Sequence, residues 1–313
     1  MSFSAFLLLR QELPHLFEEG IIQSEVPLKE HCTFQIGGPA EIFCLPDNTK
    51  QLVELLQFCL THSIPYFILG KGSNLLISDK GLKGMVISTE HFTKITKDEE
   101  YISAFCGVTL KDLANFACEN GLSGLEFASG IPGSVGGAVF MNAGAYNYEI
   151  KDILYASNCI MPVLDKIIAG KSRIHLRAAD HNFSYRHSAL QDLGLIHLSS
   201  VFHLKKENPA LIRQQMNELE QKRWQKQPME LPSAGSVFKR PQGFYTGKLI
   251  EECGLKGFRI GDAAVSEKHC GFIVNLGSAT AKDVLQLIQH IQNTVFLRYG
   301  VKLQTEIRIL GEI

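Results

Sequence analysis

The sequence predicts an α+β fold with a larger domain over residues 1–205 and a smaller domain over residues 206–313. Strand and helix signals alternate through the first half of the chain. A glycine-dense stretch with apolar filling occupies residues 124–146, and after Lys205–Pro209 the character changes to a polar, helix-rich segment. A length of 313 residues suits about two domains, each large enough to bury a core.

Helix-capping residues define the predicted helices. Asn48, Thr109 and Thr280 each precede apolar residues at helical spacing, and each side chain can accept a hydrogen bond from the first helical turn. After Thr109 and Thr280 an aspartate follows three residues later, which is the spacing of a capping box. The helix from Thr109 should end at Asn120–Gly121, and an amphipathic helix is expected from the N-terminus to about Gly20.

Two strands frame the predicted sites. Residues 65–69 read as a buried strand that runs directly into Gly70. The chain ends in a predicted strand over 302–310, in which apolar residues alternate with polar ones, so that Glu306 falls on the polar face.

Composition excludes several classes of protein. The 31 basic and 32 acidic residues give a net charge of -1, which argues against a broad basic face for nucleic acid. No apolar run approaches the length of a membrane span, and the apolar stretch near the N-terminus is too short for a secretory signal. The eight cysteines include no CxxC pair, so we expect reduced thiols that mostly fill the core, and no metal site. A cytoplasmic enzyme is the expected class.

The segment Gly70-Lys71-Gly72-Ser73-Asn74 follows a predicted strand directly. Its glycines allow successive backbone N–H groups to face one concavity that suits a pyrophosphate. A nicotinamide-binding Rossmann fingerprint is an alternative, because Glu90 stands twenty residues after Gly70. It fits poorly, since Leu75 occupies the third glycine position and two glycines, Gly81 and Gly84, interrupt the helix that should follow.

A second glycine segment, Ser129-Gly130-Ile131-Pro132-Gly133-Ser134-Val135-Gly136-Gly137, has proline at its entry. One such segment is explained by a tight buried turn. Two of them in one domain favour an extended, phosphate-bearing cofactor that lies between them.

The order of several motifs resembles the UDP-N-acetylenolpyruvoylglucosamine reductase family. The motifs are TFQIGGPA (33–40), LGKGSNLLI, SGIPGSVGGAVFMNAGAY, NFSYRHS (182–188), PSAGSVFKRP (232–241), GDAAVSEKHCGFIVN (261–275) and LQTEIRILG (303–311). They span nearly the whole chain. The short connection from Arg186 to Ser236 resembles the subgroup that lacks an inserted loop with a substrate-clamping tyrosine, and Tyr245 is a guess at a replacement.

The resemblance implies a fold, a cofactor and a reaction. The fold is a two-lobed FAD-binding domain of the vanillyl-alcohol oxidase/p-cresol methylhydroxylase type, with its lobe boundary near residue 78, plus a smaller α/β substrate-binding domain. The reaction is reduction of UDP-N-acetylglucosamine enolpyruvate to UDP-N-acetylmuramate in peptidoglycan precursor synthesis, with non-covalent FAD and with NADPH as reductant. The implied cofactor-binding residues are Gly70, Lys71, Gly72, Ser73, Asn74, Leu75, Ser129, Gly130, Ile131, Pro132, Gly133, Ser134, Gly136, Gly137, Ala138, Asn142 and Gly144.

Three residues match the catalytic positions that the resemblance implies. Arg186 would hold the substrate carboxylate through its guanidinium fork. Ser236 would donate the proton, with the cations Lys239 and Arg240 close in sequence. Glu306 would assist at the enolate, and because an ionised carboxylate repels that charge, it should act protonated, as a hydrogen-bond donor.

Lys226 and Lys239 are candidates for the substrate diphosphate, and Tyr185 is a further substrate-binding candidate. A monomer is expected. Two other functions stay open from the residues. An oxidase of the same broader fold would hold flavin covalently, for which His31-Cys32 is the candidate attachment site. A catalytically silent module would bind the UDP-sugar without flavin.

Overall fold

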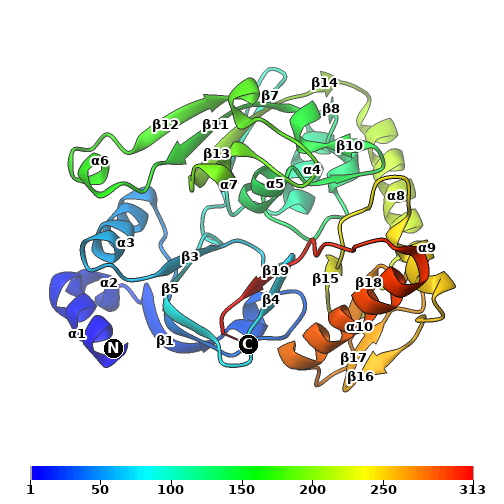
Figure 1. The fold of residues 1–313 in the computed structure, drawn as a ribbon. Helices are drawn as coiled ribbons and strands as arrows, with labels where there is room; N and C mark the ends of the chain where they lie inside the picture. The colour runs from blue at the N-terminus through cyan, green and yellow to red at the C-terminus, as the bar shows by residue number, and fades with distance from the viewer. Residues whose placement is uncertain (1, 313) are drawn as a thin grey trace. The chain divides into compact units, whose positions relative to one another are not determined.

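The computed structural model describes residues 2–312 (Figure 1). These residues divide into two compact units. Unit 1 combines the segment up to Ser24 with Ile42–Lys71 and Gly84–Glu220, and unit 2 combines Glu25–Glu41 and Gly72–Lys83 with the segment from Gln221 onward. The predicted boundary at 205–206 is therefore not a limit between these units, because two short early segments belong with the C-terminal part. A functional division at that point stays a prediction.

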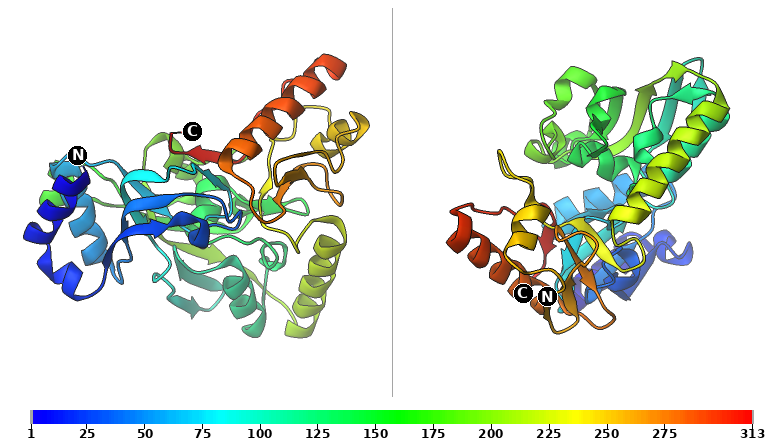
Figure 2. Two further views of the ribbon diagram at one scale, coloured as in Figure 1. Left: turned by 90° about the horizontal axis from the view of Figure 1, so that it is seen from below. Right: turned by 90° about the vertical axis from the view of Figure 1, so that its right-hand side faces the viewer.

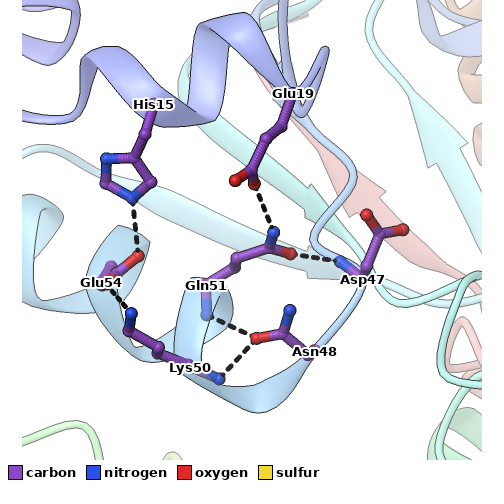
Figure 3. A network of polar contacts seen from close by, with 7 residues as sticks. All are labelled: His15, Glu19, Asp47, Asn48, Lys50, Gln51 and Glu54. Atoms are coloured by element: carbon purple, nitrogen blue, oxygen red, sulfur yellow. Dashed lines mark hydrogen bonds and ion pairs between the residues drawn. The ribbon is translucent and has the colours of Figure 1, made fainter.

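The N-terminal helical region and the helix after it belong to unit 1. Helices α1 (Ser2–Glu12) and α2 (Pro14–Glu18) replace the single predicted helix, because a proline cannot donate to the preceding turn and the helix stops before it. Helix α3 (Thr49–Thr61) begins as predicted, with Asn48 Oδ1 accepting two backbone N–H groups at 3.0 and 3.1 Å. Figure 3 shows the same turn tied to the end of α2, where Gln51 Nε2 donates to a Glu19 carboxylate at 2.7 Å.

The first sheet follows α3. Its strand order is β1-β2-β5-β3, and its members are β1 (Ile22–Pro27), β2 (Pro39–Cys44), β5 (Leu82–Ser88) and β3 (Tyr66–Leu69). Strands β3 and β5 are parallel, from Tyr66 opposite Met85 to Leu69 opposite Ser88. The limits of the two units fall within β1, β2 and β5. A core of aliphatic residues from α3 and these strands extends to Ile160, Ile196 and Leu198.

A five-stranded antiparallel sheet forms the second part of unit 1. Its order is β12-β11-β13-β7-β6, with β12 (Arg173–Arg177), β11 (Leu154–Ile160), β13 (Ile196–His203), β7 (Tyr101–Phe105) and β6 (Ile95–Asp98). Helices α4 (Leu110–Glu119) and α5 (Val135–Met141) share a core with β7 and β13. The glycine run that precedes α5 is therefore placed against this sheet.

Short elements complete unit 1 and lead into unit 2. They are β8 (Leu122–Ser123), η2 (Glu126–Ala128), β9 (Gly144–Ala145), β10 (Tyr148–Glu149), η3 (Ile150–Asp152), α6 (Leu164–Ile168), η4 (Ala178–His181), α7 (Ala189–Asp192) and β14 (Lys205–Lys206). Helix α8 (Pro209–Lys226) occupies the polar segment and crosses the limit between the units.

Unit 2 is built on a four-stranded antiparallel sheet. Its order is β15-β18-β17-β16, with β15 (Ser233–Ser236), β18 (Phe272–Asn275), β17 (Ala263–Val265) and β16 (Arg259–Ile260). Helix α10 (Ala281–Tyr299) packs against β16 and β17, as Figure 2 shows, and buries the apolar face that the sequence predicted. The remaining elements are η1 (Leu28–His31), α9 (Thr246–Glu252) and the parallel pair β4 (Leu75–Ile77) and β19 (Arg308–Leu310).

The predicted fold class is confirmed, and so are the predicted caps of α4 and α10. Thr109 Oγ1 accepts from the backbone of the third helical residue at 3.0 Å, and Thr280 forms a full capping box with Asp283. The final strand is shorter than predicted. Only Arg308–Leu310 is regular, because residues 302–307 run beside residues 237–239 through single contacts instead of a continuous ladder. Ile309 is 42% exposed, so the predicted apolar face also fails there.

The cysteines lie where the sequence analysis placed them. Seven of the eight are buried and Cys253 is intermediate, and all are free thiols. Over residues 2–312, no helix combines the length and apolar character that crossing a membrane would require. No group of three or more metal-ligating side chains is found in the same range.

Candidate active site

The two glycine segments meet in unit 1. Gly70 ends the run from β3, and a Cβ added to it would lie 2.6 Å from the Ser134 hydroxyl oxygen. A side chain at position 70 would therefore require the Ser134 hydroxyl to move. The structure therefore brings together the first residue of one predicted cradle segment and the centre of the other.

From Gly72 onward the first segment belongs to unit 2. A Cβ at Gly72, where φ is +62°, would overlap the backbone carbonyl of His31, so the protein's own packing requires this glycine. Strand β4 follows the segment where a Rossmann fingerprint requires a helix. The Rossmann alternative, with Glu90 as the ribose-binding acid, is therefore wrong.

The second segment is fixed to unit 1 by backbone hydrogen bonds. The carbonyl of Gly133 accepts from the backbone of α4 at 2.9 Å, and Gly136 N–H donates to the Cys106 carbonyl at 2.9 Å. A Cβ at Gly136 would lie 3.0 Å from that of Cys106, whereas a Cβ at Gly137 would meet only the Ser134 hydroxyl, at 3.6 Å. The fold needs glycine at 136 but not at 137, so the glycine at 137 is better explained by the approach of a ligand to the backbone.

Arg186 lies in a tight turn that is tied to the end of α5. Its φ is +57°, an uncommon value for a residue with a side chain. Asn142 Nδ2 donates to the Ser184 carbonyl at 3.1 Å, and Gln191 Nε2 donates to the carbonyl of Arg186 at 3.3 Å. The guanidinium of Arg186 reaches the Gly144 carbonyl at 3.4 Å. Helix α5, which contains Gly136 and Gly137, and the turn of Arg186 are therefore held together within unit 1.

The predicted cofactor residue Asn142 is completely buried. Its carboxamide donates to Glu149 at 3.2 Å as well as to Ser184, and it accepts from the Lys151 backbone at 3.0 Å. Both amide hydrogens are thus used within the protein. The structure gives Asn142 the task of holding the Arg186 turn, a role for which the sequence carries no local signal.

Ser236 and Glu306 lie on neighbouring segments of unit 2. Ser236 ends β15, and the N–H of Glu306 donates to the carbonyl of the next residue, Val237, at 2.7 Å. Asn74, from the first glycine segment, donates through Nδ2 to the Glu306 carbonyl at 3.2 Å. The proposed proton donor, the proposed enolate-binding acid and one cofactor segment are thus brought together, and Ser236 and Glu306 are both half-buried.

The remaining predicted substrate residues are more exposed. Lys226 ends α8 and is exposed, and Lys239 is half-buried, with its N–H bonded to the Gln304 carbonyl at 2.8 Å. Tyr245, which is 64% exposed, stacks on the guanidinium of Arg240 with 3.9 Å from Cζ to the ring centre. Of the two lysines, Lys239 lies three residues after Ser236 on the same segment.

Tyr185 is placed next to Arg186 in unit 1. It is 47% exposed, and its ring centre lies 5.1 Å from Cζ of the guanidinium. The ring therefore covers one side of the cation that we expect to bind a carboxylate.

Two buried histidines in unit 1 were not singled out by sequence reasoning. His197 is 7% exposed, and its Nε2 lies 2.6 Å from the Ser200 hydroxyl, while Nδ1 is buried without a hydrogen-bond partner. Burial, with a smaller effect from His181, lowers the pKa of His197 to about 3. Burial also lowers the pKa of His181 to about 4. A Cβ at Gly136 would lie 3.5 Å from His197 Nδ1, so this neutral ring packs directly against the backbone of the second glycine segment.

Cys32, the candidate for covalent flavin attachment, is buried and its thiol donates to the Ile36 carbonyl at 3.3 Å. Burial raises the pKa of this thiol. A thiol that is kept protonated is a poor nucleophile, so this geometry does not favour attachment at Cys32.

Comparison with known proteins assigns both parts of the chain. Residues 227–310 match the C-terminal domain of UDP-N-acetylenolpyruvoylglucosamine reductase, and residues 40–162 match an FAD binding domain. The enzyme of that name from Clostridium perfringens is 45% identical over 299 residues, which cover 96% of each chain. The one from Caldicellulosiruptor bescii is 48% identical over 288 residues, which cover 91% of this chain and 90% of the relative.

A solved structure agrees with the sequence relatives. The crystal structure of UDP-N-acetylenolpyruvylglucosamine reductase from Thermus caldophilus matches with a TM-score of 0.79 at 35% identity, and it covers 93% of this chain and 99% of that one. Three findings agree on a flavin-binding enzyme of this family. They are the two glycine segments that meet at Gly70, the match to an FAD binding domain, and relatives of this identity over nearly the full length. The chain belongs to the UDP-N-acetylenolpyruvoylglucosamine reductase family and is an FAD-dependent oxidoreductase.

Proposed function

We propose that the chain reduces UDP-N-acetylglucosamine enolpyruvate to UDP-N-acetylmuramate with NADPH as reductant and non-covalent FAD as cofactor. The observation that carries the proposal is the contact of the two glycine segments at Gly70 and Ser134 beside the anchored Arg186 turn. The enzyme would act as a monomer in the cytoplasm, in peptidoglycan precursor synthesis, and so contribute to cell wall formation, cell shape and division.

The glycine segments fit FAD. A side chain at Gly70 would displace the Ser134 hydroxyl, and the backbone at Gly137 is open although alanine would fit the fold. A diphosphate could thus approach the main chain at Gly70 and at residues 129–138 of unit 1. The chemistry that FAD supplies when bound is transfer of a hydride equivalent from NADPH to the vinyl carbon of the substrate.

Arg186 binds the substrate carboxylate. Its guanidinium is half-buried and its turn is fixed by hydrogen bonds from Asn142 and Gln191, so little side-chain or backbone entropy remains to be lost on binding. As the vinyl group is reduced, negative charge develops on the adjacent carbon and the carboxylate. A fixed cation gains interaction energy as that charge grows.

Ser236 donates the proton that completes the reduction at the carbon next to the carboxylate. The hydroxyl becomes an alkoxide as it does so, and Lys239 is the cation that follows it on the same segment. Glu306, in its protonated form, donates a hydrogen bond to the enolate oxygen. Because the segments of Ser236 and Glu306 are bonded at Val237, the two side chains are positioned by one backbone contact.

Lys226 and Lys239 neutralise the diphosphate of the nucleotide, and Tyr185 contributes its ring to the substrate. The exposed Lys226 ammonium and the half-buried Lys239 ammonium supply point charges, which suits a flexible diphosphate better than a planar carboxylate.

The visible absorption spectrum tests this function. Purified protein should show flavin bands that NADPH bleaches under anaerobic conditions, and the enolpyruvyl nucleotide should restore them. Ser236→Ala should still be bleached by NADPH but should recover at least a hundredfold more slowly, while Ser233→Ala, a matched change at the start of β15, should recover normally. A colourless protein that takes up no FAD would refute the proposal, and colour retained in the acid precipitate would indicate covalent flavin.

A further inference from the structure

The face of the five-stranded sheet that is turned toward α3 in unit 1 carries a cavity of about 380 Å³. Ligand sites in proteins have volumes of roughly 300–1,000 Å³, so this one can hold a small molecule. Its lining comes from Thr49 at the start of α3 and from residues of β7, β11, β12 and β13: Phe105, Asn158, Arg173, Ile174, His175, Leu198 and Ser199. None of the residues proposed for catalysis or flavin binding is among them.

Strand register places four of these side chains in one row. Asn158 is opposite His175 on one side and opposite Ser199 on the other, and Ser199 is opposite Phe105. Residues that are directly opposite in a sheet project from the same face. The row therefore crosses four adjacent strands from an imidazole to a phenyl ring.

Hydrogen bonds fix the polar part of the row. Asn158 Nδ2 donates to the Ser199 hydroxyl at 3.2 Å, and Asn158 Oδ1 lies 3.2 Å from His175 Nδ1. Because a carboxamide oxygen only accepts, His175 carries its proton on Nδ1 and presents Nε2 as the free end of the row. The side chains are thus oriented before any ligand binds.

Arg173 supplies a positive charge at the edge of the same cavity. It stands two residues before His175 on β12 and so projects from the same face of the sheet. Among residues 2–312, no ion pair of Arg173 is found, and the lining contains no carboxylate. The apolar side chains of Phe105 and Leu198 lie at other lining positions, whereas the side chain of Ile174, between Arg173 and His175, packs against the α4 and α5 core on the opposite face.

We propose that this cavity binds a small ring-bearing anion, with a phosphate or carboxylate on the guanidinium of Arg173 and the ring against Phe105. An unpaired guanidinium is the group best suited to a bidentate anion contact. The phenyl ring of Phe105 and the side chain of Leu198 suit a flat ring, and the ordered amide and imidazole suit polar substituents on it. The site is separate from the flavin and substrate machinery, so the proposal stands or falls independently of the proposed function.

The test uses the FAD-loaded enzyme and phenyl phosphate as the probe. The imidazole resonance of His175, identified by its loss in His175→Gln, should shift in a saturable way as phenyl phosphate is added. In Arg173→Gln the dissociation constant should rise about tenfold, as expected for loss of a charge-assisted contact. Arg177→Gln is the matched control, because Arg177 lies on the same strand, is exposed and pairs with Asp180 at 3.6 Å, outside the cavity.

Two further probes separate the parts of the ligand. Inorganic phosphate and phenol should each shift the His175 resonance more weakly than phenyl phosphate. The proposal is overturned if phenyl phosphate causes no saturable shift, if Arg177→Gln weakens binding as much as Arg173→Gln, or if inorganic phosphate binds as tightly as phenyl phosphate. The last result would mean a general anion contact without a ring site.

Discussion

Replacing Gly137 by alanine separates what the fold needs from what a bound nucleotide needs. Gly137 lies in the first turn of α5, and a Cβ there would meet only the Ser134 hydroxyl, at 3.6 Å. Alanine is preferred over glycine in a helix by about 0.5–1 kcal/mol, so Gly137→Ala should raise the free energy of unfolding of the flavin-free protein by that order. If FAD approaches the backbone at Gly137, the added methyl group should weaken FAD binding about tenfold, or ~1.4 kcal/mol.

Urea unfolding of the flavin-free protein measures the first effect, and quenching of FAD fluorescence on titration measures the second. Gly136→Ala is the control for packing alone. Its Cβ would lie 3.0 Å from that of Cys106 and 3.2 Å from the Cys106 carbonyl, which should cost about 1–3 kcal/mol of stability. A Gly137→Ala protein that is stabilised but binds FAD as tightly as the wild type would refute our placement of the cofactor at this residue.

Three further predictions address the active site and its support. Glu306→Gln keeps a hydrogen-bond donor and should retain at least tenfold more turnover than Glu306→Ala, and equal losses would contradict the neutral-donor role. Because the pKa of His197 is about 3 in the fold and about 6.5 when unfolded, only the unfolded chain gains this proton between these values; stability should be full above pH 6.5 and about 2 kcal/mol lower at pH 5. Urea midpoints at pH 7.5 and 5.0 should show that His197→Gln removes this part of the acid sensitivity, and an unchanged sensitivity would disprove it. Gln191→Leu removes the bonds from Gln191 Nε2 to the Arg186 carbonyl and to the Phe140 carbonyl of α5, so KM for the substrate should rise several-fold while flavin reduction by NADPH stays normal; a loss in the NADPH step would count against a role confined to the Arg186 turn.

The sequence predicts the helices of this fold better than its sheets. Capping side chains act within four residues of the helix they start, so Asn48, Thr109 and Thr280 could be identified from local pattern alone. Sheet membership depends on partners far away in the chain. The predicted strand over 302–310 is longer than the observed one for this reason. Its alternating pattern does not reveal that β4 offers only three residues for pairing.

The two compact units could not be predicted for a similar reason. Unit 2 takes in Glu25–Glu41 and Gly72–Lys83, which stand more than a hundred residues before the rest of that unit. Ala281 and Lys282 show the kind of contact involved, since their backbone N–H groups at the start of α10 donate to the Asp79 carboxylate at 2.9 and 3.3 Å. A single acid in a loop gives no signal of such a distant partner.

The site residues likewise divide into those that a sequence motif reveals and those that only the folded structure reveals. Motifs identified the groups expected to touch substrate and cofactor, and Gly70, Arg186, Ser236 and Glu306 are all placed in ordered, partly buried positions. Sequence reasoning does not find the supporting residues Gln191 and His197, because their hydrogen bonds and ring contacts depend on the folded geometry. Nothing in their sequence neighbourhood distinguishes them from ordinary helix or strand residues.

The backbone of Arg186 shows why support of this kind is needed. A residue with a side chain at φ +57° is less stable there than glycine, by about 1 kcal/mol. Glycine would suit the turn but would remove the guanidinium, so the conformation has to be held by other groups. The bonds from Asn142 to Ser184 and from Gln191 to the Arg186 carbonyl supply that restraint. A strained residue that is held at both ends is a sign of a functional requirement at its side chain.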